Sequence, residues 1–337
     1  MSDFRLSDPG HLAQMARALP AADAEAEAAA RARQDSLTKP PGSLGRLEDL
    51  AVFMAGWQRR ARPRIDKAQA IVFAGNHGIC AQGVNPYPQA VTAQMVANFA
   101  AGGAAINQLA RVAGAELGVE ALDLDRPTGD FTQGPAMSAA EVVEALNRGA
   151  QAVDPAADVL ILGEMGIGNS TVAAALAAAA FGGTGADWVG PGTGAGAEMR
   201  AKKAAVVDAG LARHAPRSAG AALMGFGGRE QAAICGAILA ARAARIPVIL
   251  DGFICTAAAA VLTLDDPRLL DHCLIGHVSA EPGHARLIAA LGKTPVVALD
   301  MRLGEGSGAA VALLILRAAL ACHDGMASFA EAGVSGA

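Results

Sequence analysis

Two glutamates draw attention because each follows a short apolar run, is preceded by glycine, and leads into a glycine-rich turn and an Ala-rich stretch. Glu164 lies in "LGEMGIGNST" (162–171), and Glu305 lies in "RLGEGSGAA" (302–310). Charged glutamate is rarely buried without a purpose. Two carboxylates near a phosphate-binding helix terminus suit acid–base work on a nucleotide-like substrate. We therefore expect Glu164 and Glu305 to carry the chemistry.

The segment around Glu164 nearly matches the Walker A loop G-x-x-x-x-G-K-[ST]. Gly163, Gly168 and Ser170 are in place, but Asn169 stands where the lysine would neutralise the phosphates of a triphosphate. What remains is a glycine-rich turn that opens a helix, which suits a single phosphate held by backbone N–H groups and short polar side chains. Ordinary N-capping by Asn169 or Ser170 is the alternative.

The segment around Glu305 matches the dinucleotide-binding pattern G-x-G-x-x-A, with Gly304, Gly306 and Ala309. We expect no dinucleotide there, because no further strand follows to carry the ribose-binding acid. Glu305 would also place a negative charge beside a pyrophosphate. "VGPGTGAG" (189–196) is a second glycine-rich turn before a helix, and alone it indicates little.

"VILDGFICT" (248–256) resembles the strand–acid–Thr loop of diphosphate-dependent phosphoribosyltransferases. It has one acid, Asp251, where two are usual, and a Mg²⁺–pyrophosphate site would want more oxygen ligands. A ribosyl phosphate substrate is thus not expected to arrive as a diphosphate. His77, His277 and His284 follow apolar runs without any metal-binding spacing, so packing or capping is favoured. We predict no metal and no cofactor.

A parallel sheet would position these residues. Continuous apolar runs bounded by Gly or Asp alternate with Ala-rich helical stretches, which predicts buried parallel strands in a doubly wound α/β fold. Ligands then bind at the carboxyl ends of the strands. The expected strands are seven runs: 70–75, 118–125, 158–164, 221–227, 247–252, 272–279 and 295–300.

The first seventy residues instead predict helices, over 23–37 and 44–61, separated by the "TKPPGSLG" turn. We expect an N-terminal helical segment (1–69), a catalytic α/β domain (70–325) and a C-terminal tail (326–337). The small helical subdomain is predicted to form from both ends of the chain.

Composition limits the class of protein. Of 337 residues 53% are hydrophobic but only 4% aromatic, so the core must be Ala, Val and Leu in close packing. The net charge of −5, with no basic cluster, argues against nucleic acid as a partner. The N-terminus lacks a signal-peptide pattern, and the uncharged run 166–186 is too rich in polar residues and glycine for a membrane span. Five scattered cysteines without a C-x-x-C pair indicate reduced thiols in a cytoplasmic protein.

Six segments taken together resemble the nicotinate-nucleotide–dimethylbenzimidazole phosphoribosyltransferase family. They are "LTKPPGSLGRLEDLA", "FAGNHGICAQGVNPYPQAVTAQMV", "GEMGIGNSTVAAAL", "GPGTG", "GFGGREQAAICGAILAA" and "ALDMRLGEGSGAA", and the resemblance runs from about residue 35 to 334. It implies transfer of 5-phosphoribosyl from nicotinate mononucleotide to 5,6-dimethylbenzimidazole. The products would be α-ribazole 5′-phosphate and nicotinate, with inversion at C1′. A Rossmann-like fold with a small helical domain and a homodimer are also implied.

The resemblance also implies roles for individual residues. Glu305 corresponds to the general base and Glu164 to a second active-site carboxylate. A lysine after the glycine-rich turn best matches Lys203, although the pair Lys202–Lys203 could equally form a solvated helix face. The nucleotide phosphate would bind at Gly166, Gly168, Asn169, Ser170 and Thr171. The base pocket would use Gln94, Leu303 and Asn85. Many members of the family have serine at the position of Asn85.

Two other functions remain open from the sequence. A nucleotide-dependent oxidoreductase would use the glycine-rich turns, and a nucleotide-sensing protein would keep the fold without the chemistry. The presence of both Glu164 and Glu305 argues against a sensor. Within the family, benzimidazoles, adenine and phenols are all plausible acceptors, and the apolar N-terminal helices are candidates for the dimer interface.

Overall fold

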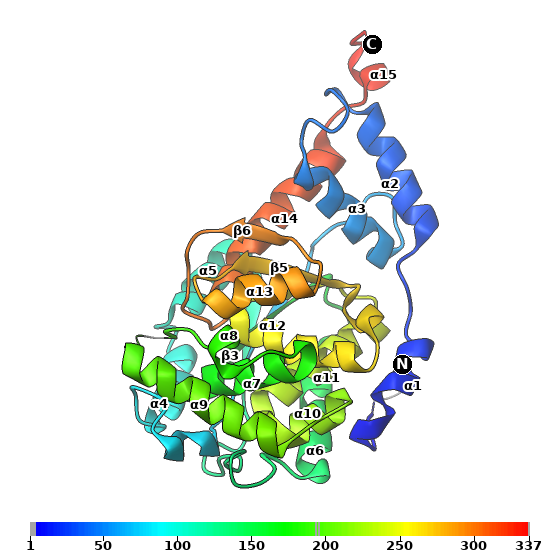
Figure 1. The fold of residues 1–337 in the computed structure, drawn as a ribbon. Coiled ribbons are helices and arrows are strands. Elements are labelled where there is room, and N and C mark those ends of the chain that lie inside the picture. Colours follow the sequence, from blue (N-terminus) through cyan, green and yellow to red (C-terminus); the bar gives the residue numbers. More distant parts are fainter. Residues whose placement is uncertain (1–4, 193, 195, 336–337) are drawn as a thin grey trace.

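The computed structural model describes residues 5–192, 194 and 196–335. In this part of the chain a six-stranded, all-parallel sheet has the order β2-β1-β3-β4-β5-β6 (Figure 1). The strands are β1 (Ala68–Ala74), β2 (Ala115–Ala121), β3 (Val159–Met165), β4 (Val248–Leu250), β5 (Cys273–Val278) and β6 (Pro295–Ala298). The predicted doubly wound parallel fold is confirmed.

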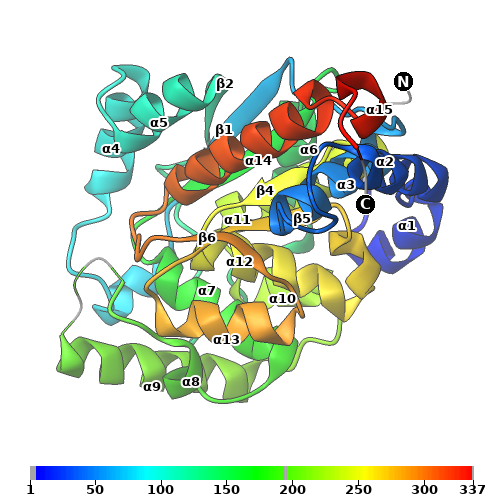
Figure 2. The same cartoon turned by 90° about the horizontal axis from the view of Figure 1, so that it is seen from above.

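Helices cover both faces of the sheet, as Figure 2 shows for α14 on one side and α13 on the other. The α-helices are α1 (Leu12–Ala18), α2 (Ala24–Ser36), α3 (Arg46–Gln58), α4 (Ala90–Ala100), α5 (Ala105–Ala113), α6 (Ala139–Ala152), α7 (Asn169–Phe181), α8 (Gly185–Trp188), α9 (Ala197–Arg213), α10 (Ala219–Phe226), α11 (Arg229–Ala243), α12 (Phe253–Ala260), α13 (Pro282–Ala290), α14 (Ser307–Gly325) and α15 (Phe329–Ala332). Short 3-10 helices are η1 (Pro9–His11), η2 (Gly78–Gln82), η3 (Val261–Leu264) and η4 (Pro267–Leu270).

Alternate residues of each strand face opposite sides of the sheet, which creates two buried cores. Leu160 and Leu162 of β3 pack with α6, α7, α11 and α12, whereas Val159 and Ile161 pack with α3, α5 and α14. Both sets are fully buried. The predicted strands are continuously hydrophobic because helices cover both faces of the sheet, as expected.

One predicted strand is wrong. Residues 221–227 lie within α10 and its C-terminal Gly227, not in the sheet. Ser218 precedes the run, and its side chain accepts a hydrogen bond from the backbone N–H of Ala221, which starts a helix. The run contains no β-branched residue, and a short buried helix and a buried strand are equally apolar.

Helices from the N-terminal and C-terminal parts of the chain form a helical unit at one end of the molecule, while α1 lies apart from it (Figure 1). The predicted N-terminal helices are α2 and α3, and they pack against each other and against α14. Arg33 of α2 donates to the carbonyl oxygens of His323, Asp324 and Met326. The small subdomain from both termini is confirmed, while the exact domain bounds stay a prediction.

Membrane spanning was not expected for the run 166–186, and its helix α7 lies in the core with most of its side chains buried. Within the described residues, α14 is the one helix long and apolar enough to cross a membrane by length and composition. Half of that stretch is buried inside the protein, where Leu313 and Leu316 pack on the sheet.

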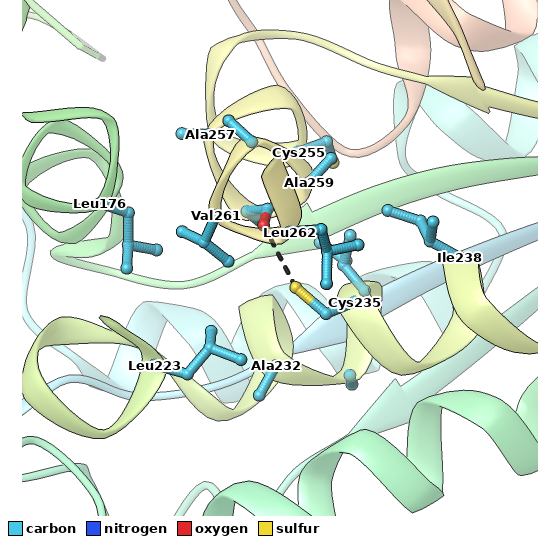
Figure 3. Packing of buried hydrophobic residues seen from close by; sticks show 14 of the residues in the cluster. Leu176, Leu223, Ala232, Cys235, Ile238, Cys255, Ala257, Ala259, Val261 and Leu262 are labelled. Carbon is cyan, nitrogen blue, oxygen red and sulfur yellow. Dashed lines mark hydrogen bonds between the residues drawn. The ribbon is translucent and has the colours of Figure 1, made fainter. Parts of the chain in front are cut away.

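Small residues let the helices approach closely, as Figure 3 shows for Ala232, Cys235 and Ala257 in the aromatic-poor core. The thiol of Cys235 donates to the carbonyl oxygen of Ala258 at 3.1 Å. All five cysteines are free, and three of them are buried. The expected Ala-, Val- and Leu-rich packing is what the structure contains.

The α6–α11 contact gives the first testable prediction. A Cβ on Gly236 would overlap the carbonyl oxygen of Leu146, and a Cβ on Gly149 would overlap that of Ala233. We expect Gly236→Ala to lower the free energy of unfolding by about 1–3 kcal/mol, because two backbones must separate. Urea denaturation measures the change. Gly134→Ala is the matched control, since its Cβ would meet no atom within 4 Å.

Candidate active site

A pocket lies at the carboxyl ends of β3, β4 and β5, where an open parallel sheet is expected to bind ligands. Four loops line it: the turn after β3, the start of α12, the loop after β5 and the loop after β6, joined by a segment near η2 and by α9. The lining residues are Asn85, Pro86, Tyr87, Glu164, Met165, Gly166, Ile167, Gly168, Asn169, Ser170, Gly192, Lys203, Gly252, Phe253, Ile254, His277, Ser279, Glu281, Arg302, Leu303 and Gly304.

Glu164, the penultimate residue of β3, lines this pocket and is 5% exposed. The side-chain amide of Asn169 donates a hydrogen bond to its Oε2. Burial raises the pKa of Glu164 to about 8, and the charges of Asp251 and Glu230 add to that shift. Glu164 is therefore a carboxyl group whose ionisation is costly until a positive charge arrives beside it.

Glu305 lies directly behind Gly304, at the edge of the pocket rather than in its lining. Its backbone is left-handed (φ 65°), between Gly304 (φ 89°) and Gly306 (φ 87°), which is uncommon for a residue with a side chain. Only glycines tolerate the neighbouring conformations readily. The two glycines thus shape a turn that presents one carboxylate.

The two glutamates are neighbours across this turn. A Cβ on Gly304 would lie 2.6 Å from Oε1 of Glu164, and a Cβ on Gly163 would lie 2.5 Å from the backbone of Glu305. Burial raises the pKa of Glu305, as does the charge of Asp251, while the backbone N–H of Ile106 opposes the shift. Oε2 of Glu305 is buried without a hydrogen-bond partner. This oxygen therefore has hydrogen-bonding capacity that no described residue uses.

A cation lies beside the start of α7, which follows the turn after β3. Nζ of Lys203, in α9, donates to Oγ of Ser170 at 3.1 Å, and the lysine is 3% exposed. Burial lowers the pKa of Lys203, and the charge of Glu281 opposes that effect. Lys202 is exposed, so the structure separates the two lysines that the sequence left equivalent. Lys203 and Ser170 form a corner suited to an anion at the start of α7.

Most of the residues proposed from the sequence meet in the pocket: Gly166, Gly168, Asn169, Ser170, Lys203, Asn85 and Leu303 line it. Thr171 does not, because it is fully buried within α7. Gln94 does not line it either, and lies exposed on α4. Of the glycine-rich turn 189–196, residues 193 and 195 lie outside the described residues.

Four polar residues were not assigned to the site from the sequence. His277 is the penultimate residue of β5, Glu281 lies in the loop after β5, and Arg302 lies in the loop after β6; all three line the pocket. Asp251 follows β4 and is fully buried beneath the turn of Glu305. Their positions at the ends of apolar runs marked them as candidates, because ligands bind at the carboxyl ends of parallel strands. Residue type alone did not indicate what each of them does.

The site is rich in acids and suits a substrate that carries both a positive charge and an anion. Glu164 and Glu305 offer negative charge, and Lys203 offers a cationic donor beside Ser170. Among the described residues, no group of three or more His, Cys, Asp or Glu side chains could hold a metal ion. Acid–base and electrostatic catalysis by the side chains themselves is the chemistry that this arrangement supports.

Comparison with known proteins agrees over nearly the whole chain. Residues 19–334 match a family model described as phosphoribosyltransferase. The nicotinate-nucleotide–dimethylbenzimidazole phosphoribosyltransferase of Rhodobacter capsulatus is 62% identical over 332 residues, which cover 98% of this chain and 99% of that protein. That of Ruegeria pomeroyi is 59% identical, with 98% of each chain covered. The crystal structure of the enzyme from Thermus thermophilus has a TM-score of 0.88 and 41% identity, and covers 94% of this chain and 100% of its own.

Proposed function

This chain belongs to the nicotinate-nucleotide–dimethylbenzimidazole phosphoribosyltransferase family, and on that premise we propose that it transfers 5-phosphoribosyl from nicotinate mononucleotide to 5,6-dimethylbenzimidazole or a related base. The products are α-ribazole 5′-phosphate and nicotinate. The observation that carries the proposal is one pocket that combines two buried carboxylates, Glu164 in its lining and Glu305 directly after it, with the Lys203–Ser170 pair.

The chemistry needs a base and no metal. The ring nitrogen of nicotinate mononucleotide is already cationic, so it departs from C1′ as a neutral pyridine nitrogen that takes the bonding electron pair. The benzimidazole nitrogen attacks C1′ from the opposite face, which inverts the configuration, while its partner N–H loses a proton. Glu305 accepts that proton, and it directly follows Gly304 of the pocket lining.

Glu164 stabilises the positive charge that develops on the ribose in the transition state. It lines the pocket, and its pKa of about 8 reflects a site in which an anion lacks counter-charge. A cationic ring or an oxocarbenium-like ribose supplies that counter-charge and favours the ionised carboxylate. Leu303 and Tyr87, about half exposed on the rim, offer apolar surface to the acceptor base.

The phosphate of the nucleotide is proposed to bind at the start of α7, near Gly166, Gly168, Asn169 and Ser170, with Lys203 as its cation. We expect Lys203→Met to raise the KM for nicotinate mononucleotide at least tenfold, with a smaller effect on kcat, because the contact is the same in ground and transition states. Steady-state kinetics measure both constants. Lys202→Met, at the exposed neighbour, is expected to change neither. Equal effects of the two substitutions would contradict the assignment.

We also propose that the protein acts as a homodimer in the cytoplasm. Free thiols at all five cysteines suit a reducing compartment. Light scattering on the purified protein tests the oligomeric state.

The decisive experiment is incubation with nicotinate mononucleotide and a panel of bases, followed by mass spectrometry of the products. Release of nicotinate together with a ribosyl-phosphate adduct of the base is expected. No nicotinate release with any base would reject the transferase function. Turnover of NAD(P)H would instead favour an oxidoreductase, and nucleotide binding without any turnover would favour a sensor.

A further inference from the structure

Asp251 is a buried acid that the proposed chemistry does not use. It follows β4 directly and is fully buried. Its Oδ2 accepts the backbone N–H of Gly306 at 3.0 Å, and its Oδ1 accepts that of Ala309 at 2.9 Å. Both N–H groups belong to the start of α14, directly after Glu305. The carboxylate therefore caps this helix from another strand, 55 residues earlier in the chain.

The start of α14 needs such a cap. Its N-terminal Gly306 has no side chain to satisfy the free N–H groups, and no local side chain replaces it. Three successive left-handed residues precede the helix, and the middle one is Glu305. A non-glycine residue persists in this conformation only where its surroundings hold it. The two hydrogen bonds to Asp251 fix the residue that follows Glu305.

His277 lies on the other side of Asp251. Its Nε2 is 3.6 Å from Oδ1 of Asp251, and both side chains are buried. The imidazole fits against backbone, because a Cβ on Gly308 would overlap its ring and a Cβ on Gly252 would lie 3.2 Å from Nε2. His277 also lines the pocket. His277, in the pocket lining, thus contacts Asp251, which caps the N-terminus of α14.

We propose that Asp251, supported by His277, is a positioning residue for Glu305, which it holds in the left-handed turn from which the carboxylate accepts a proton. The inference rests on the proposed role of Glu305 as base. It gives Asp251 a function different from the diphosphate loop that the sequence around it resembles, because both of its oxygens bind backbone N–H groups.

Asp251 also acts on Glu305 through its charge. Burial raises the pKa of Glu305, and the negative charge of Asp251 raises it further. Burial raises the pKa of Asp251 itself, while His277 and the N–H groups of α14 oppose that shift. The other titratable groups near this cluster are Glu164, Glu230, Cys255 and His284, whose ring packs against that of His277. Removing the charge of Asp251 should therefore lower the pKa of Glu305.

The test is Asp251→Asn in the full-length protein. The amide keeps one acceptor but turns an N–H₂ group toward the second backbone N–H, which loses its partner. We expect kcat to fall about 10- to 100-fold from misplacement of the base, with the KM for nicotinate mononucleotide changed less than about threefold. The acidic limb of the kcat profile should move to lower pH, because the base then ionises more readily.

Asp265→Asn is the matched control. Oδ2 of Asp265 accepts the backbone N–H of Ala219 at the start of α10, so it also caps a helix but lies outside the pocket lining. We expect that variant to lose stability without a shift in the pH profile. A kcat and pH profile for Asp251→Asn that match either the wild type or this control would overturn the inference.

A double-mutant cycle with Glu305→Gln separates the inference from the proposed function. Asp251→Asn should cost far less in the Glu305→Gln background than in the wild type, because it acts through Glu305. Equal costs in both backgrounds would overturn the positioning role. Near-wild-type turnover of Glu305→Gln alone would instead reject Glu305 as base.

His277→Gln provides a second variant if Asp251→Asn does not fold. It leaves the cap in place but removes the imidazole that favours ionised Asp251. We expect activity to be lost at higher pH than in the wild type, since Asp251 then takes up a proton more readily and releases α14. An unchanged acidic limb in this folded variant would overturn the inference.

Discussion

Glu305→Gln should lower kcat for transfer to 5,6-dimethylbenzimidazole about 10²- to 10⁴-fold, the usual contribution of a positioned general base. Glutamine has nearly the same shape and is neutral, but it cannot accept the benzimidazole proton. Binding of nicotinate mononucleotide should change little, because Lys203 and Ser170 lie in α9 and α7 and not in the turn of Glu305. The loss should therefore appear in kcat rather than in KM.

The pH dependence gives a second readout for the same variant. Wild-type kcat should fall as the pH drops through the raised pKa of Glu305, because the protonated carboxyl cannot act as a base. The Glu305→Gln variant should lose that dependence. Glu144→Gln, at an exposed position on α6, is the control and should match the wild type. Near-wild-type turnover of Glu305→Gln at neutral pH would show that the proton goes elsewhere.

The sheet, and the edge at which the two glutamates lie, could be predicted because parallel strands place all their carboxyl ends at one edge. Continuous apolar runs located the six strands, and Glu164 and Glu305 each follow such a run, which places both at that edge. Their close approach could not be predicted, because β4 and β5 lie between β3 and β6, and the loop after β6 has to reach back to β3. The wrong strand prediction at residues 221–227 arose because the pattern there does not distinguish a strand from a helix. A seven-residue run made only of apolar residues and glycine shows no polar–apolar period, and only the preceding Ser218 indicated a helix.

Residues that act through the folded chain could not be assigned from the sequence. Lys202 and Lys203 are adjacent, yet one is exposed and the other is buried beside Ser170, because successive residues of a helix point about 100° apart. Asp251 lies in a segment that resembles a diphosphate loop, but its partners are backbone N–H groups of α14. Such contacts depend on how distant elements pack, which no local pattern encodes.

Glu164→Gln should stabilise the free protein at alkaline pH while lowering its activity. The pKa of Glu164 is raised from 4.5 to about 8, chiefly by burial and then by the charges of Asp251 and Glu230. Between these two values the unfolded chain releases the proton and the folded protein keeps it, so wild-type stability falls as the pH rises from about 4.5 to about 8. Above pH 8 the folded protein carries the full cost of a buried anion.

Glutamine removes that cost, since it is neutral at every pH and its side-chain oxygen can still accept the hydrogen bond from Asn169. The variant should match the wild type near pH 4.5 and exceed it above pH 8, by about 2–4 kcal/mol after allowance for relaxation. Urea denaturation at pH 5, 7 and 8.5 measures the difference, with Glu144→Gln as a control that should show none. A constant difference at all three pH values would contradict the buried-anion explanation.

The same substitution should lower kcat about 10²- to 10³-fold, the scale of losing one preorganised electrostatic group. The two effects share one cause. An anion at position 164 is unfavourable in the empty pocket and favourable once the ribose becomes cationic, so the group that destabilises the free protein is the one that stabilises the transition state. Nicotinate mononucleotide should accordingly stabilise the wild type more than the variant at pH 8.5. A variant that gained stability but kept full activity would separate the two effects and remove Glu164 from the mechanism.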